Sequence, residues 1–270
     1  MRNALAAGIY ENLSNHEYHS DSAVGSSTLK TLATKTPLHV KSKVYKESPA
    51  FDLGSAVHLA ILEPHYSDKI IRGADTRRGN SWKDAKLEAD ASGHILLTSE
   101  DYDDVFRMRD SVHRHKYASS LLTGNVKAEL SLFHEIEGTR VKIRPDNFNY
   151  DGNVMLDLKT AVSASPDHFA KSVAMYGYHI QRSFYQRVWE DYHGSKIDDF
   201  LFLVVEKEAP FAVAIYRLDE WTIAEGYHIV ERTLKQYREC LDGDTWEGYP
   251  ETIQTLRLPQ WAFQCVDIPA

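Results

Sequence analysis

Two aspartates and a lysine lie close together near the middle of this 270-residue chain. The segment VMLDLKT contains Asp157 and Lys159, and the preceding segment RVKIRPD ends in Asp146. Hydrolysis of a phosphodiester needs a nucleophile made from water and stabilisation of the charge that develops at phosphorus. Two carboxylates can hold a divalent cation for this purpose, and a nearby lysine can orient water or stabilise negative charge. These residue types therefore indicate metal-dependent phosphodiester cleavage.

The alternation of apolar and polar residues predicts strands that bring these side chains together. Asp157 and Lys159 share one face of the strand VMLDLKT, opposite its apolar face. Arg144 and Asp146 share the corresponding face of RVKIRPD, so a hairpin of the two segments would place the three reactive groups on one side. Asp-x-Lys is also common on solvated strand faces, and the spacing alone leaves that alternative open.

The elements predicted around this hairpin describe an α/β protein, with a mixed sheet flanked by helices and an N-terminal helical portion. Helices are predicted at 26–35, 51–64, 99–122, 165–172, 176–194 and 219–241, with a loop at 70–86 that leads into a further helix. Strand periodicity at 127–136, 139–150 and 153–161 predicts a three-stranded antiparallel meander, and 199–207 and 211–219 predict two more strands. With no repeat and no Gly/Ser/Pro-rich linker, one domain over residues 1–270 is expected.

Composition narrows the class of protein. The hydrophobic fraction of 43% and the charged fraction of 26% are ordinary for a globular chain. The net charge of −8 is unusual for a DNA-binding protein, but a carboxylate site with a local basic surface accommodates it. Two cysteines, Cys240 and Cys265, cannot form a four-cysteine zinc or iron–sulfur site, and no Walker-type motif occurs. No apolar run is long enough for a signal peptide or a membrane span, so a reduced, cytoplasmic protein is expected.

The order of short motifs resembles the PD-(D/E)XK nuclease superfamily, and within it the RecE-type exonuclease (exonuclease VIII) domain. The motifs are LGSAVH, the strand KAELSLF, RPD, LDLKT and QRSFY, in that order. The opening GIYENLSNHEYHSDSAVGSSTLKTLATKTPLHV and the closing TLRLPQWA also match, so the resemblance covers nearly the whole chain. It implies a restriction-endonuclease-like core.

The resemblance assigns roles to individual residues of that core. It implies that His58, Asp146 and Asp157 are metal ligands and that Lys159 is the catalytic lysine. Glu129 matches an acidic residue on the first strand, either in support of the metal site or at a second metal. Taken without the resemblance, the sequence favours the alternative that His58 is a surface or core histidine of its helix.

Further candidates surround this set. Gln181 and Tyr185 match a Q-x-x-x-Y motif on one helix face, and are expected to support the site or touch the DNA strand. An amphipathic helix with incidental polar residues is the alternative. Four basic residues are candidate phosphate contacts, although a charge run is usually a solvated face. They are Arg77, Arg78, Lys83 and Arg144.

The implied function is a Mg²⁺-dependent exodeoxyribonuclease, with Mn²⁺ as a substitute, acting on ends of linear double-stranded DNA. It would digest the 5′-ended strand and leave 3′ single strands for a single-strand annealing recombination protein. A homo-oligomeric ring around DNA and no membrane association are expected.

Two alternatives remain open from the sequence. One is an endonuclease or repair nuclease of the same superfamily, and the other a DNA-binding or assembly protein with a vestigial site. Under the main hypothesis, Asp157→Ala and Lys159→Ala would abolish digestion. They would do so with little loss of folding, because both side chains are expected to be exposed.

Overall fold

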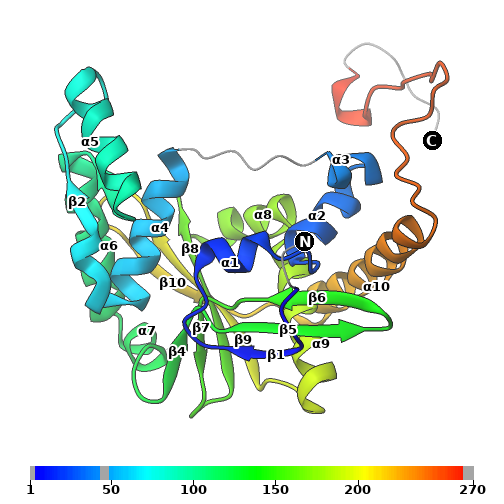
Figure 1. Cartoon of the computed structure of the whole chain (residues 1–270), viewed down its shortest axis with the longest axis horizontal. Helices are drawn as coiled ribbons and strands as arrows, with labels where there is room; N and C mark the ends of the chain where they lie inside the picture. Colours follow the sequence, from blue (N-terminus) through cyan, green and yellow to red (C-terminus); the bar gives the residue numbers. More distant parts are fainter. Residues whose placement is uncertain (1–3, 43–48, 264–270) are drawn as a thin grey trace.

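A five-stranded mixed sheet lies at the centre of the computed structural model, which describes residues 4–42 and 49–263 (Figure 1). Its strand order is β10–β9–β8–β7–β4. The strands are β4 (Val126–Ala128), β7 (Asn147–Asn149), β8 (Val154–Ala161), β9 (Asp199–Glu206) and β10 (Val213–Tyr216). β8 and β9 run parallel, and the other neighbouring pairs are antiparallel. The predicted mixed sheet with flanking helices is confirmed.

Helices cover both faces of this sheet. α8 (Pro166–Tyr176) and α9 (Tyr178–His193) connect β8 to β9 and pack on the face that carries Met155 and Phe202. α4 (Pro49–Leu62) and α6 (Ser99–Arg114) pack on the other face, which carries Leu158 and Leu203. A strand buried on both faces needs apolar residues at every position, and the nearly continuous apolar sequence of β9 follows from that burial.

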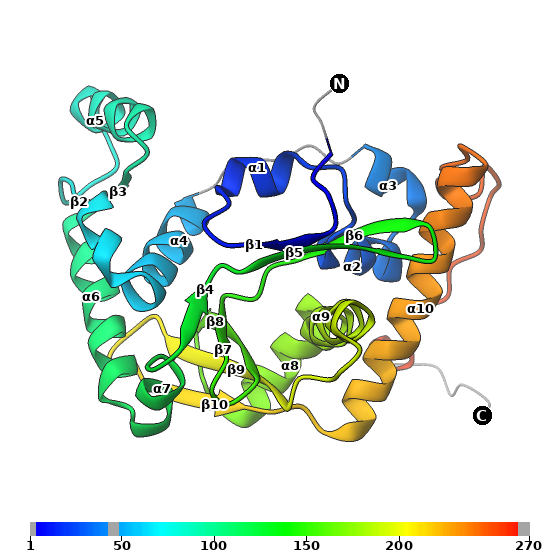
Figure 2. The ribbon, with the colours of Figure 1, turned by 60° about the horizontal axis from the view of Figure 1, so that its bottom comes forward.

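A second, three-stranded antiparallel sheet crosses the edge of the first. It contains β1 (Gly8–Tyr10), β5 (Ser131–Ile136) and β6 (Thr139–Ile143) in the order β1–β5–β6. In Figure 2 the β5–β6 hairpin runs across the upper side of β4, β7 and β8. α2 (Ser26–Thr34), α9 and α10 (Glu220–Asp242) contribute to the core on its inner side.

The predicted three-stranded meander is therefore wrong, because two of its strands are divided between the sheets. The first is interrupted between β4 and β5 at Glu129, whose φ of +51° turns the chain. The second is interrupted between β6 and β7 at Pro145 and Asp146. Proline has no N–H to donate to a strand ladder, so the pairing is interrupted there.

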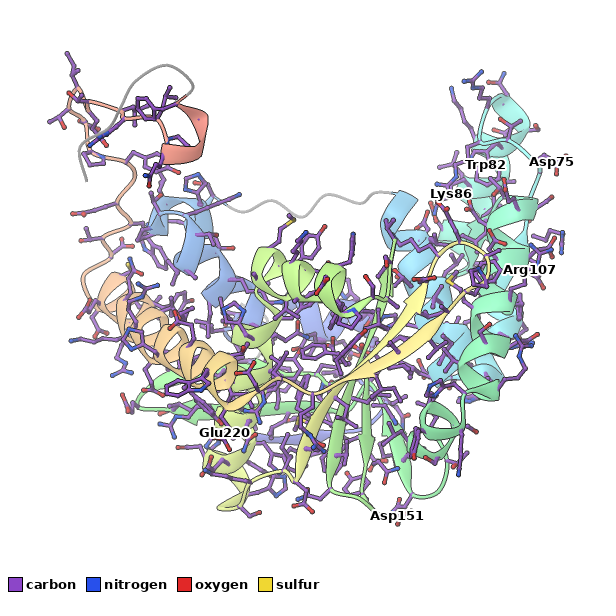
Figure 3. The ribbon with its side chains drawn as sticks, turned by 180° about the vertical axis from the view of Figure 1, so that it is seen from behind. Asp75, Trp82, Lys86, Arg107, Asp151 and Glu220 are labelled. Atoms are coloured by element: carbon purple, nitrogen blue, oxygen red, sulfur yellow. The ribbon has the colours of Figure 1, made fainter. Side chains whose placement is uncertain are left out.

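A small projecting unit follows α4. The 3₁₀ helix η1 (Pro64–Lys69) leads into β2 (Ile70–Arg72), which pairs in parallel with β3 (Ile95–Leu97), and α5 (Asn80–Ala91) connects the two strands. Figure 3 labels Trp82 and Lys86 on this unit, far from Asp151 in the β7–β8 turn. Gly73 lets the chain pass close to the Trp82 ring, since a Cβ there would lie 2.7 Å from it. The predicted loop at 70–86 thus contains a strand that the sequence patterns did not indicate.

The remaining helices are short. They are α1 (Asn15–Ser20), α3 (Pro37–Lys41), α7 (Lys116–Leu121) and η2 (Gln260–Ala262). The helix predicted at 99–122 is broken at His115, whose Nδ1 accepts a hydrogen bond from the Ala118 N–H and so caps α7. Among the described residues, no helix has the length and apolar character needed to cross a membrane.

Candidate metal-dependent active site

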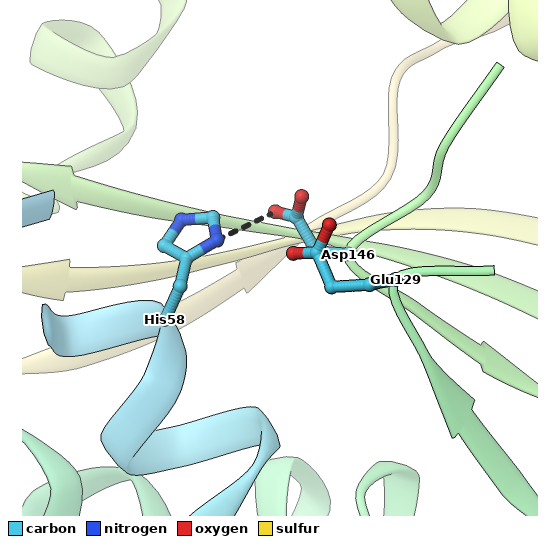
Figure 4. Close-up of side chains that lie close together, drawn as sticks. All are labelled: His58, Glu129 and Asp146. Carbon is cyan, nitrogen blue, oxygen red and sulfur yellow. Dashed lines mark ion pairs between the residues drawn. The ribbon is translucent and has the colours of Figure 1, made fainter. Parts of the chain in front are cut away.

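Three side chains from distant parts of the chain converge beside the large sheet (Figure 4). His58 comes from α4, Glu129 from the junction of β4 and β5, and Asp146 from the junction of β6 and β7. One ligand atom of each lies within 4.8 Å of the others, and His58 Nδ1 is 3.7 Å from Asp146 Oδ2. A hydrogen bond of 3.1 Å from the Glu129 N–H to the Asp146 carbonyl joins the two strand junctions. The division of strands between two sheets is therefore what brings the two carboxylates together.

In its neutral form, the histidine can present a lone pair to this group. His58 Nε2 lies 3.1 Å from the carbonyl oxygen of Leu158, which can only accept a hydrogen bond. Nε2 therefore carries the proton, and in the neutral ring Nδ1 faces the carboxylates without one. A backbone carbonyl that orients the ring in this way is the usual support of a metal-ligating histidine.

The two carboxylates are poorly compensated by nearby positive charge. Burial and then the Asp146 carboxylate raise the pKa of Glu129 to about 8, against the opposing effect of Arg144, whose guanidinium is 3.8 Å away. Burial also raises the pKa of Asp146, although Asp146 Oδ2 accepts a 2.6 Å hydrogen bond from the Leu158 N–H. A divalent cation would relieve this repulsion, and carboxylate oxygens with one imidazole suit Mg²⁺ or Mn²⁺. The residues present thus fit the predicted metal.

Asp157 and Lys159 form an ion pair next to this trio, in which Asp157 is buried and Lys159 is half-buried. Asp157 Oδ2 pairs with the Lys159 ammonium, and Oδ1 accepts a 2.6 Å hydrogen bond from Gln181 Nε2. Burial disfavours the charge of Lys159, but Asp157 and Asp146 outweigh it and raise the pKa of Lys159 above its ordinary value. The expectation that Asp157 is exposed is wrong: its side chain is 1% exposed, because helices cover both faces of β8.

Of the predicted metal ligands, the structure brings His58 and Asp146 together with Glu129. Asp157 lies outside this trio, since its two oxygens are directed at Lys159 and Gln181. Asp157 and Asp146 are nevertheless adjacent across the β7–β8 pairing, in which Asn147 stands opposite Leu156. The four acidic and imidazole groups thus belong to one continuous site.

Gln181 and Tyr185 both point inward from one face of α9. Gln181 bonds Asp157, and the Tyr185 hydroxyl donates a 3.1 Å hydrogen bond to the Arg144 carbonyl, one residue before Pro145. Both residues are buried. Their position supports the strands that carry the site, which is one of the two roles expected of them.

Arg144 is placed differently from the predicted phosphate contact. Its guanidinium donates to Ser131 Oγ (2.7 Å), Asn15 Oδ1 (2.7 Å) and the Leu13 carbonyl (3.0 Å). It also lies 4.0 Å from the centre of the Tyr18 ring and is buried. These contacts tie the N-terminal segment to the strand junction, and they replace the predicted contact with DNA.

The other three candidate phosphate contacts lie in the projecting unit. Arg77 pairs with Asp101 at 2.8 Å. Arg78 and Lys83 are exposed. Their contact with DNA stays a prediction.

Lys30 and Tyr178 belong to the site, although the motifs did not single them out. Lys30, on α2, donates a 2.8 Å hydrogen bond to Gln181 Oε1. The ammonium groups of Lys30 and Lys159 lie 5.3 and 4.9 Å from the centre of the same Tyr178 ring. The available signal was a lysine beside the apolar stripe of the predicted helix, directly after Leu29, where a charge needs an internal partner.

The raised pKa of Glu129 predicts a pH dependence of stability in the metal-free protein. The folded state binds the Glu129 proton more tightly than the unfolded chain, so this stabilisation is present at low pH. It is lost as pH rises from about 4.5, the ordinary value, to about 8. Urea unfolding in a chelator should show a falling midpoint over this window. Glu129→Gln should flatten the fall, whereas Glu135→Gln, at an exposed position of β5, should not. An equal slope in Glu129→Gln and wild type would contradict the assignment.

A mixed sheet covered by helices, with two carboxylates and a histidine beside an Asp-x-Lys strand, defines a nuclease fold of the PD-(D/E)XK type. The chain belongs to the family described as "PDDEXK-like domain of unknown function (DUF3799)", whose model matches residues 25–259. This membership confirms the resemblance that the motifs indicated.

A similar fold occurs in a solved structure. A "Putative exonuclease" from Eubacterium rectale has 18% sequence identity and a TM-score of 0.65, over 93% of this chain and 96% of that chain. A "phage related exonuclease" from Haemophilus somnus 129PT has 12% identity and a TM-score of 0.34, over 83% and 96%. No curated protein matches the chain.

Proposed function

We propose that this protein is a Mg²⁺-dependent exodeoxyribonuclease that digests linear double-stranded DNA from its 5′ ends. The observation that carries the proposal is the contact between two groups of residues. The trio of His58, Glu129 and Asp146 is joined through Leu158 to the ion pair of Asp157 and Lys159. Carboxylates, an imidazole and a protonated lysine together are the groups that phosphodiester hydrolysis requires.

Asp146, Asp157 and His58 would hold the cation, with Glu129 as a further ligand. When bound, the cation supplies Lewis-acid stabilisation of the negative charge that develops on the phosphate. Lys159 acts on the same charge. Because the two aspartates keep its ammonium protonated, Lys159 donates to a phosphate oxygen or to the attacking water and does not serve as the base.

Metal dependence is the first test of this proposal. Cleavage of linear duplex should stop in excess chelator and return with Mg²⁺ or Mn²⁺, since the cation would supply the Lewis-acid stabilisation of the phosphate charge. Ca²⁺ should support DNA binding without cleavage. The measurement is gel analysis of a labelled duplex with each cation at equal concentration. Full activity in chelator would refute the metal mechanism.

End-labelled DNA separates the proposed activity from its alternatives. Each strand of a linear duplex is labelled in turn, and a closed circular duplex is the control. Early release of the 5′ label, with the circle intact, is expected. Cleavage of the circle would identify an endonuclease or repair nuclease. Binding without cleavage, with Lys159→Ala behaving as wild type, would identify a DNA-binding protein with a vestigial site.

The RecE-type resemblance supports two further proposals about assembly. We infer a homo-oligomeric ring of single-domain subunits around the duplex, with exposed basic residues such as Arg78 and Lys83 toward the DNA. A ring reconciles the net charge of −8 with DNA binding, because only the channel must be basic. We also infer that the 3′ strands pass to a single-strand annealing protein. Light scattering of the purified protein tests the first proposal, and co-purification with an annealing protein tests the second.

A further inference from the structure

We propose that Lys30 is a positioning residue of the nuclease site. It holds the Gln181 amide in the orientation that directs the NH₂ group at Asp157. The inference rests on the proposed function for its catalytic consequence. The contact itself is observed in the structure and joins two residues that are 151 positions apart in sequence. Lys30 Nζ lies 2.8 Å from Gln181 Oε1, and Gln181 Nε2 lies 2.6 Å from Asp157 Oδ1.

Only one orientation of the Gln181 amide satisfies both its hydrogen bond with Lys30 and its hydrogen bond with Asp157. A lysine ammonium only donates hydrogen bonds, an ionised carboxylate only accepts them, and an amide has one end of each kind. With the amide oxygen toward Lys30, the amide NH₂ must face Asp157. Rotation of the amide by 180° would direct NH₂ at the ammonium and a lone pair at the carboxylate, so both contacts would become repulsive. Lys30 and Asp157 therefore favour the same orientation, in which Gln181 donates to Asp157, and Lys30 reinforces it from the far end of the amide.

Packing against Gly177 holds the aliphatic stem of Lys30 in the position that the hydrogen bond to Gln181 requires. Gly177, which joins α8 to α9, has a φ of +62°, and a Cβ there would lie 3.2 Å from Lys30 Cγ. The aliphatic stem thus passes over the glycine that begins α9. Lys30 is half-buried, and burial followed by the Lys159 charge lowers the pKa of Lys30 to about 8. An ammonium in this position has few alternatives to its contacts with Gln181 and the Tyr178 ring.

The consequence for the site concerns the direction of the Asp157 carboxylate. With Oδ1 bound to Gln181, Oδ2 is the oxygen that meets Lys159. Freeing the amide would let the carboxylate rotate away from this geometry. A displacement of a catalytic group by about 1 Å can cost on the order of 100-fold in rate.

A substitution series at Lys30 tests the direction of the hydrogen bond. Lys30→Met should lower kcat about 10-fold, and Lys30→Arg should keep most activity because it still donates. Lys30→Glu should be worse than Lys30→Met, because an acceptor at that position favours the reversed amide. DNA affinity in Ca²⁺ should be unchanged in Lys30→Met. The control is Lys35→Met, at the exposed end of α2, which should behave as wild type.

A double-mutant cycle with Gln181 decides between positioning and direct contact with DNA. If Lys30 acts through the amide, Lys30→Met should have no further effect on kcat in a Gln181→Leu background. Multiplicative losses in the double variant would overturn the proposal, as would a loss confined to DNA affinity, because a phosphate contact does not need Gln181.

The same cycle in urea unfolding of the metal-free protein needs no activity. The midpoint shift of the double variant should equal that of Gln181→Leu alone, whereas additive shifts would overturn the contact even in an active enzyme. A wild-type protein that cleaves no DNA would refute the proposed function. A coupled unfolding cycle in such a protein would still support the orientation of Gln181 by Lys30.

Discussion

If the proposed function holds, Lys159→Ala is expected to lower the rate of DNA cleavage about 100- to 1000-fold, because it removes the charge proposed to act on the reacting phosphate. The burial of Asp157 in its ion pair with Lys159 adds a second effect that exposed side chains would not produce. Removing one member leaves the Asp157 carboxylate buried without its cationic partner, which typically costs about 3 to 5 kcal/mol of stability. The metal-free variant should therefore melt well below wild type, and Mg²⁺ should recover part of the difference by pairing with Asp157.

Single-turnover cleavage and calorimetric unfolding, each with and without Mg²⁺, measure the two effects of Lys159→Ala. Lys171→Ala is the matched control, since Lys171 is exposed on α8. Retained stability in Lys159→Ala would contradict the ion pair. Retained cleavage in a folded Lys159→Ala protein would contradict the catalytic role.

Asp146→Asn is expected to produce opposite effects on activity and stability. Cleavage should fall at least about 1000-fold, because the amide is a weak ligand for a divalent cation. Metal-free stability at pH 8 should rise by about 1 kcal/mol, since the variant removes a buried charge that repels Glu129 and Asp157. Asparagine keeps an oxygen for the Leu158 N–H, so the strand contact is retained.

Urea unfolding in chelator and calorimetric titration with Mn²⁺ test Asp146→Asn without reference to DNA. Binding of Mn²⁺ should be lost or weakened at least about 10-fold, in parallel with the gain in metal-free stability. Asp84→Asn, at an exposed position on α5, should change neither quantity. Unchanged Mn²⁺ affinity would remove Asp146 from the metal site, and lower stability would show that its charge is compensated in the fold.

Local patterns account for much of what could be predicted. The bounds predicted for α2 and α10, 26–35 and 219–241, lie within one residue of the observed ends. Strand periodicity predicted β8 and β9. The signals failed where an element depends on its partner: β1 and β2 are three residues each and exist only through pairing with β5 and β3.

The residues of the site also fall into two groups, those that local sequence patterns predicted and those whose position depends on tertiary packing. Asp146, Asp157 and Lys159 could be proposed from their types and spacing, and His58 from the motif order. The position of Glu129 beside His58 and Asp146 depends on its turn between two sheets, which alternation in 127–136 does not reveal. Lys30 could not be placed, because its partner on α9 is set by packing between α2 and α9.

The sequence by itself determined the chemistry available to this protein: two aspartates and a lysine near a proline, and a histidine on an apolar helix. Such features are local, because side-chain alternation and hydrogen-bonding capacity belong to single segments. Only the tertiary structure decided that Asp157 is buried, that Arg144 serves the fold, and that Glu129 joins His58 and Asp146. Burial and electrostatic coupling depend on which distant segments cover a residue, and the packing of helices on both faces of the sheet determines them.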